Sequence, residues 1–233
     1  MSKHDFLPPE RLNAINRLTV VARLLSSAVH DTRNALQIVT GHAELFAEAA
    51  FDQEKARERS RIILSQADRA TQRMHGLVTM TQPDGRPAER IELRQLADDV
   101  LSLRRSSFGR ARIRAAVAPA EGQFWAFAVR ADVVRAAANL MLNAERSISG
   151  RAGAEIRFEV SRADGQMHLA VRDNGPGVSD EMLPHLFEPF APGDGPGLGL
   201  HVSRYLMEKS GGQLVHTDNS DGATFTISLP AAP

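Results

Sequence analysis

The segment Asp173-Asn-Gly-Pro-Gly177 is the starting point for interpreting the second half of the chain. It directly follows a predicted strand near 167–172. Glycine permits backbone conformations and close approaches that a β-carbon would block, so Gly175 and Gly177 can line a pocket around a planar base. The Asp173 carboxylate only accepts hydrogen bonds, which suits an exocyclic amine such as that of adenine. Taken alone, the segment also fits a simple Asx turn.

An asparagine pair precedes this segment in Asn139-Leu-Met-Leu-Asn143, within a predicted helix over 131–148. The i and i+4 spacing places both amides on one face of an otherwise apolar helix. Amide oxygens are hard ligands that suit Mg²⁺, whose coordination is usually completed by water and phosphate. A pair of asparagines on a solvated face is the alternative interpretation.

Two further motifs follow Gly177. The first is Leu186-Phe-Glu-Pro-Phe190, and the second is Gly193-Asp-Gly-Pro-Gly-Leu-Gly-Leu200, which opens a predicted helix over 198–209. Glycine-rich backbone amides at a helix N-terminus form an anion site, so phosphates fit the second motif. The two phenylalanines can anchor a segment that closes over a nucleotide, although packing in the core explains both rings equally well.

In this order, the four motifs resemble the N, G1, F and G2 boxes of the histidine kinase ATP-binding domain, over about 93–230. The resemblance implies an α/β sandwich of the gyrase, chaperone and kinase type that binds Mg-ATP under a lid. Asn143 would be the Mg²⁺ ligand and Asp173 would bind the adenine amino group. The other implied ATP-binding residues are Asn139, Arg146, Gly175, Gly177, Phe187, Phe190, Gly195, Gly197, Leu198 and Gly199. The lid is short here and contains no lysine or threonine.

Two amphipathic patterns precede this domain. Apolar residues recur three or four apart from Leu12 to about Ala50, among them Leu18, Val29 and Leu36, and a second such pattern ends near Leu77. They predict a helical hairpin whose uncovered apolar stripe pairs with a second copy, giving a homodimeric four-helix bundle. The alternative is that the stripe packs on the C-terminal domain. We place the hairpin at 1–81, a linker rich in helix breakers at 82–90 and the catalytic domain at 91–233.

A histidine lies in the middle of the first predicted helix, in the segment Val29-His30-Asp31-Thr-Arg-Asn34-Ala35. The segment resembles the H box of histidine kinases, which makes His30 the implied phosphoacceptor. Neutral imidazole is a good nucleophile near physiological pH, and Asp31 can fix its tautomer through a hydrogen bond, given a suitable rotamer. In the family an amide at Asn34 supports dephosphorylation of the partner. Ala35 stands where the family usually has proline.

Composition excludes several classes of protein. Lysine and arginine total 28 and so do aspartate and glutamate, so no net charge attracts nucleic acid or anionic lipid. Without cysteine there are no disulfides, thiolate metal sites or cysteine nucleophiles, and no apolar run approaches the ~20 residues that cross a bilayer. These features and the lack of a signal-peptide pattern lead us to expect a cytoplasmic protein with no membrane segment.

The resemblance therefore implies a two-component histidine kinase that phosphorylates His30 with Mg-ATP and passes the phosphoryl group to a response regulator receiver domain. Phosphatase activity and a sensor on a separate protein or domain are further expectations. One alternative is a histidine phosphotransfer protein whose ATP-like domain is not catalytic. A hydrolytic ATPase of the same superfamily is disfavoured because Asn139 stands where those enzymes carry a glutamate base. An anti-sigma serine kinase would lack the histidine-bearing hairpin.

Overall fold

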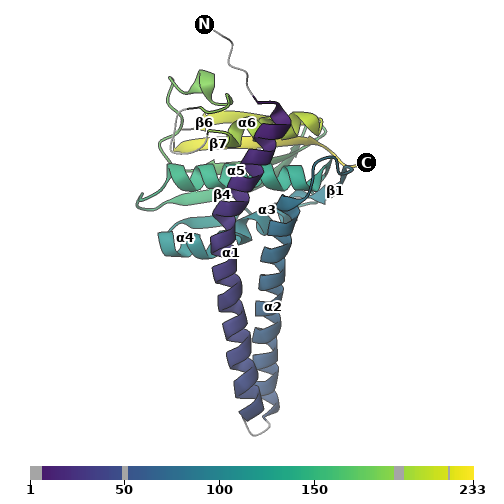
Figure 1. The fold of residues 1–233 in the computed structure, drawn as a ribbon, viewed down its shortest axis with the longest axis vertical. Coiled ribbons are helices and arrows are strands. Elements are labelled where there is room, and N and C mark those ends of the chain that lie inside the picture. Colours follow the sequence, from purple (N-terminus) through teal and green to yellow (C-terminus); the bar gives the residue numbers. More distant parts are fainter. Residues whose placement is uncertain (1–6, 49–51, 192–196, 220) are drawn as a thin grey trace.

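The computed structural model describes residues 7–48, 52–191, 197–219 and 221–233. Its N-terminal part is the predicted hairpin, formed by α1 (Pro9–Glu48) and α2 (Gln53–Thr81). Proline suits the first position of α1 because the N–H that it lacks has no partner there. Asp52 caps α2, since its carboxylate accepts hydrogen bonds from the Glu54 and Lys55 backbone amides at 3.0 and 3.2 Å. Figure 1 shows the hairpin extending as a stalk well beyond the rest of the molecule.

The C-terminal domain is an α/β sandwich. Its main sheet has the strand order β2-β4-β5-β7-β6, with β2 and β4 parallel and the remaining pairs antiparallel. The strands are β2 (Arg114–Val117), β4 (Glu155–Ala163), β5 (Gln166–Asp173), β6 (Gln213–Asn219) and β7 (Gly222–Pro230). A separate antiparallel pair joins β1 (Glu89–Glu92) to β3 (Trp125–Ala128). Burial alternates along β5, as expected of a strand with one face on the core.

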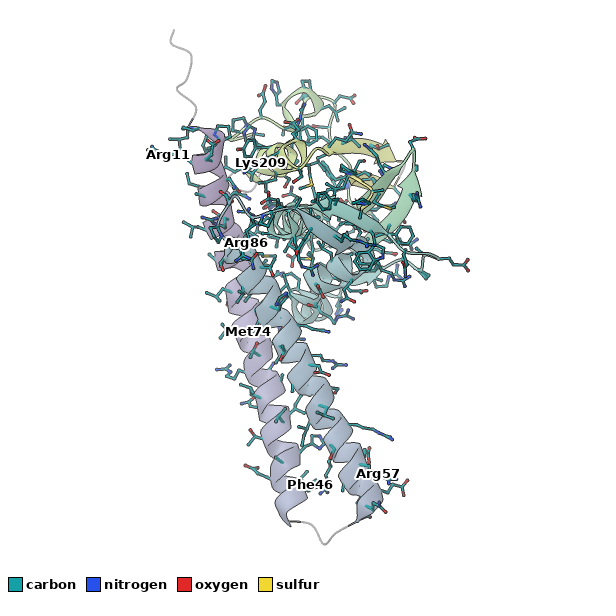
Figure 2. The ribbon with its side chains drawn as sticks, turned by 90° about the vertical axis from the view of Figure 1, so that its right-hand side faces the viewer. Arg11, Phe46, Arg57, Met74, Arg86 and Lys209 are labelled. Carbon is teal, nitrogen blue, oxygen red and sulfur yellow. The ribbon has the colours of Figure 1, made fainter. Side chains whose placement is uncertain are left out.

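Helices cover one face of this sheet. They are α3 (Leu93–Ser102), α4 (Arg105–Ala111), α5 (Arg130–Ser147) and α6 (Gly199–Lys209), and a 3-10 turn, η1, spans Leu183–His185. Every residue of α5 from Ala131 to Leu142 is buried, because the helix lies between the sheet and the hairpin. Figure 2 shows the same order of layers from the side, with α1 and α2 against the helical layer and the sheet beyond it.

One predicted helix is divided in two. The sequence pattern predicted a single helix from Leu93 to about Ser106, but the structure ends α3 at Ser102 and starts α4 at Arg105. Arg104 leaves the helical conformation, and its guanidinium pairs with Glu145 of α5 across the helical layer. This long-range ion pair is invisible to a local pattern.

The apolar stripe predicted for α1 lies mostly on the surface. Leu18 is 70% exposed, Val29 57% and Leu36 56%, so the C-terminal domain does not cover them. Leu12, at the start of the predicted stripe, is buried, and a neighbouring face of α1 is buried as well, through Val20, Leu24, Ala28 and Ala35. The stripe therefore remains available to another surface.

Candidate active site

A cavity of 630 Å³ lies where the predicted motifs meet. The end of β5, the middle of α5 and the start of α6 form its walls, and α1 closes one side. Residues predicted from the motifs that line it are Asn139, Asn143, Arg146, Asp173, Gly177, Gly197 and Gly199. Segments as far apart in the sequence as Asn16 and Phe225 thus converge on one space.

Asp173 is held at the inner end of the cavity. Its carboxylate accepts hydrogen bonds from the Gly175 backbone amide at 2.8 Å and from the Ser147 hydroxyl at 3.4 Å. Burial raises the pKa of Asp173, although these hydrogen bonds oppose the rise. A β-carbon at Gly175 would lie 2.2 Å from Ser147 Oγ and 2.6 Å from Asp173 Oδ1, so the turn admits no larger residue without movement. Gly177 has a φ of +78°, a conformation that favours glycine.

The two asparagines of α5 have different surroundings. Asn139 is buried, and its amide nitrogen donates to Gly199 O at 3.2 Å and to Ser203 Oγ at 3.0 Å, which ties α5 to α6. Its Oδ1 accepts a hydrogen bond from Asn16 of α1 at 3.3 Å. Asn143 is only half-buried and lines the cavity. Asn143 is therefore placed to bind a ligand, whereas Asn139 fixes the surrounding helices.

The glycine motif lies at the N-terminus of α6. Leu198 is buried and caps the helix without a side-chain hydrogen bond, so the backbone amides of the first turn have no side-chain acceptor there. Gly197 has a φ of +65°, and a β-carbon at this position would lie 2.6 Å from Ala191 O. Gly195 lies outside the described residues. The first turn of α6 is thus suited to an anion.

The two phenylalanines do not line the cavity. Phe187 packs against the core with Arg204 stacked 5.3 Å from its ring centroid, and Phe190 is 56% exposed. Phe190 also has a φ of +60°, and its backbone amide donates to Gly197 O at 2.9 Å. Their placement supports a role in holding the segment before α6 rather than in direct contact with a nucleotide. Leu198 likewise lies in the core, beside the cavity.

Sequence reasoning missed the α1 wall of the cavity, formed by Asn16, Thr19, Val20 and Arg23. These residues recur three or four apart, so they share one face of α1. Polar residues at positions 16 and 23 of an otherwise apolar pattern were a signal, but nothing in the pattern identified the surface that they contact.

His30 lies further along α1, outside the cavity lining, with 47% of its side chain exposed. Asp31 does not hydrogen-bond the imidazole in the rotamer seen here: Asp31 Oδ1 lies 3.6 Å from His30 Nδ1, within the range of an ion pair with a protonated imidazole, and the Asp31 side chain is 99% buried. Adjacent helical residues point in different directions, which explains the separation. Asn34, one turn on, takes that place, with its amide 3.2 Å from Nδ1.

The cavity suits Mg²⁺ only together with phosphates. Among the described residues that line it, Asp173 is the one carboxylate, and Asn143 offers an amide oxygen. Across the described ranges, no three histidine, aspartate or glutamate side chains gather to hold a metal ion. A hard cation bound mainly through phosphate oxygens and water, with one protein amide, fits this donor set.

In the same described ranges, no helix is long and apolar enough to span a membrane.

Comparison with known proteins agrees with this geometry. Residues 128–233 match the model of the family described as histidine kinase-, DNA gyrase B-, and HSP90-like ATPase. These residues are therefore similar to an ATPase domain of that family. Over 231 residues the chain is 28% identical to the sensory histidine kinase/phosphatase NtrB of Rhizobium leguminosarum bv. phaseoli. The aligned region covers 91% of this chain and 59% of NtrB. The chain therefore spans somewhat over half the length of this relative.

Solved structures of histidine kinases share the fold. Full-length ShkA in complex with AMPPNP aligns with a TM-score of 0.59 at 22% identity, covering 97% of this chain and 46% of ShkA. Histidine kinase ThkA in complex with the response regulator protein TrrA aligns with a TM-score of 0.56 at 19% identity, covering 93% of this chain and 64% of that one. The resemblance to the core of sensor histidine kinases, hairpin included, is confirmed.

Proposed function

We propose that the chain is the catalytic core of a two-component histidine kinase, in which Mg-ATP bound in the cavity phosphorylates His30. The observation that carries this proposal is the position of α1. The helix that bears the candidate phosphoacceptor also forms a wall of the candidate nucleotide cavity, through Asn16 and Arg23. His30 follows Arg23 by two helical turns, which is about 10 Å along the axis. The same helix thus borders the candidate nucleotide cavity and carries the candidate phosphoacceptor.

In this proposal Asp173 accepts a hydrogen bond from the adenine amino group, and the glycines on either side leave room for the base. Asn143 supplies the amide oxygen that completes the coordination of Mg²⁺, and the first turn of α6 faces the phosphates. Bound Mg²⁺ would neutralise charge that develops on the phosphate oxygens. The AMPPNP in the related ShkA structure supports a nucleotide in this fold.

The contact between Asn34 and His30 bears on the reactive nitrogen. An amide presents either its NH₂ or its carbonyl oxygen, and the two ends are assigned from the hydrogen-bond network. The structure places Asn34 Nδ2 at 3.2 Å from His30 Nδ1. With the amide turned by 180°, its carbonyl oxygen accepts a hydrogen bond from Nδ1–H, and the lone pair of Nε2 is left free to react. Nε2 then attacks the γ-phosphorus, the bond to the β-phosphate bridging oxygen breaks, ADP leaves, and the imidazole loses its proton to solvent.

Because His30 does not line the cavity, transfer requires the C-terminal domain to move along α1. A shift of about two turns would bring the cavity to His30. Polar pairs such as Asn16 with Asn139 and Ser27 with Ser107 join α1 to the domain. Leu12, Val20 and Leu24 of α1 also belong to the same buried apolar cluster as the core of the domain. These contacts must break when the domain moves along α1, and the phosphorylating arrangement must replace them.

We further propose that the phosphoryl group passes to an aspartate of a receiver domain and that Asn34 supports the reverse dephosphorylation. The name of NtrB includes phosphatase, and ThkA was solved with a response regulator. The exposed stripe at Leu18, Val29 and Leu36 supports homodimerisation of the hairpin. The boundaries at 1–81, 82–90 and 91–233 remain our proposed division, with a signal supplied by another protein or domain. Dependence on ATP supports a cytoplasmic site of action.

Incubation with γ-labelled ATP and Mg²⁺ tests the proposal. The wild-type chain should acquire label that is labile in acid and stable in alkali, as expected of phosphohistidine, and His30→Gln should acquire none. Label on a folded His30→Gln variant, or acid-stable label on both proteins, would contradict the assignment of His30. Absence of label on a folded wild-type chain that accepts phosphate from an outside donor would favour the phosphotransfer protein instead.

A further inference from the structure

Two arginines from different parts of the chain line the same cavity. Arg23 comes from α1 and Arg146 from the last turn of α5. The nearest acidic residue on α5, Glu145, already accepts two hydrogen bonds from Arg104. Within the part of the chain that the structure describes, neither Arg23 nor Arg146 forms an ion pair. Two cationic side chains thus meet at a cavity without an anion between them.

The position of Arg23 is fixed by hydrogen bonds on both sides of it along α1. Asn16 donates to Asn139 at 3.3 Å, seven residues before Arg23, and Ser27 contacts Ser107 Oγ at 2.8 Å, one turn after it. Residues 16, 23 and 27 lie on one face of a helix with 3.6 residues per turn. Arg23 is therefore held towards the cavity, even though much of its side chain reaches solvent at the cavity mouth.

The electrostatic surroundings of Arg23 are unfavourable in the absence of a ligand. Partial burial lowers the pKa of Arg23, and the charge of Arg146 lowers it further, opposed in part by Glu145. The guanidinium stays charged at neutral pH because its ordinary pKa is so high. A polyanion between the two arginines would remove this repulsion, and guanidinium groups bind phosphate oxygens in a bidentate manner.

We propose that Arg23 binds phosphate oxygens of the nucleotide, so that α1 completes the triphosphate site opposite Arg146. This inference rests on the proposed function, because it assumes that the cavity takes a nucleoside triphosphate. It makes Arg23 a binding residue supplied by the hairpin rather than by the ATPase domain. Residues 128–233, which match the ATPase family, do not contain it. Nucleotide affinity then depends on the docking of α1.

Equilibrium binding to the full chain tests this, with Mg-ATP and adenosine as the two probes. Arg23→Gln should weaken the binding of Mg-ATP about tenfold, because a charge-assisted hydrogen bond to phosphate is lost. Adenosine, which has no phosphate, should bind wild type and variant equally. Arg11→Gln is the matched control, since it makes the same change of charge on an exposed site of α1 that projects away from the domain (Figure 2). It should bind Mg-ATP as the wild type does.

Unchanged Mg-ATP affinity in Arg23→Gln would overturn the inference, as would an equal loss for adenosine and Mg-ATP. An equal loss in Arg11→Gln would also overturn it, because the effect would then be one of net charge. Arg23→Lys should recover part of the affinity through its retained charge. If the wild-type chain binds no Mg-ATP, the proposed function itself fails, and this result is distinct from normal binding in the variant.

Discussion

The hairpin and the C-terminal domain keep their reactive groups in opposite environments. His30 lies on an exposed helix surface, whereas Asp173 is buried at the end of a cavity. The hairpin also leaves Leu18 and Leu36 more than half exposed, while α5 of the domain is buried over most of its length. One half of the molecule is thus a packed unit around a cavity, and the other presents an exposed histidine and an exposed apolar stripe. The difference matches an acceptor that must be reached from outside and a donor that must be enclosed.

Polar contacts join the two halves. Arg135 of α5 is 99% buried and pairs with Asp132 of the same helix and, at 2.9 Å, with Asp84 of the linker. Asn13 of α1 donates to Asp84 at 3.0 Å, and Arg17 donates to Gln82 O at 3.3 Å. Asp84 therefore connects the hairpin, the linker and the domain in one network.

The largest expected effect is a loss of folding stability in Arg135→Ala, at the network that joins the two halves. The change leaves Asp132 buried without its cation, and burial already raises the pKa of Asp132. Breaking a buried ion pair costs about 3–5 kcal/mol, so unfolding in urea should shift to markedly lower denaturant. Arg157→Ala removes an exposed pair with Glu155 and should cost less than about 1 kcal/mol. Equal stability of the two variants would contradict a stabilising role for the buried network around Arg135.

A smaller effect is expected on association. Leu36→Asp places a charge in the exposed stripe, and each buried leucine contributes about 1.5–3 kcal/mol. A symmetric dimer loses two such contacts, so its dissociation constant should rise at least about 100-fold in sedimentation equilibrium. Gln37→Asp, at the next exposed position, is the control and should change the constant little. An unaffected dimer in Leu36→Asp would place the dimer interface elsewhere.

The smallest expected effect is a change in the melting temperature of the unliganded protein in Asp173→Asn. Since burial raises the pKa of Asp173, the folded state holds a proton more tightly than the unfolded state. Protonation of Asp173 therefore favours the folded state. This contribution to stability is fully present below the pKa of Asp173 in the unfolded chain and is lost as pH rises through its pKa in the folded chain. Asp173→Asn carries no charge, so its melting temperature should exceed that of the wild type at neutral pH. The difference should shrink as pH falls below the raised pKa, and a difference independent of pH would contradict the role of burial.

The sequence predicted the parts of the site that depend on local motifs. Asp173, Gly177, Asn143 and Gly199 line one cavity, and each belongs to a short motif that the sequence alone makes visible. The α1 wall did not follow, since Asn16 and Asn139 are 123 residues apart and their contact depends on how two units dock. The break between α3 and α4 and the turning of Asp31 into the hairpin depend on long-range packing in the same way.

The most direct test of the division between the halves is equilibrium binding of Mg-ATP to His30→Gln beside Asp173→Asn. The account predicts that His30→Gln, although it cannot be phosphorylated, binds Mg-ATP within about twofold of the wild type, because His30 does not line the cavity. Asp173→Asn should lose at least about tenfold in affinity through its hydrogen bond to the base. Loss of binding in His30→Gln to the level of Asp173→Asn, or normal binding in Asp173→Asn, would contradict the account.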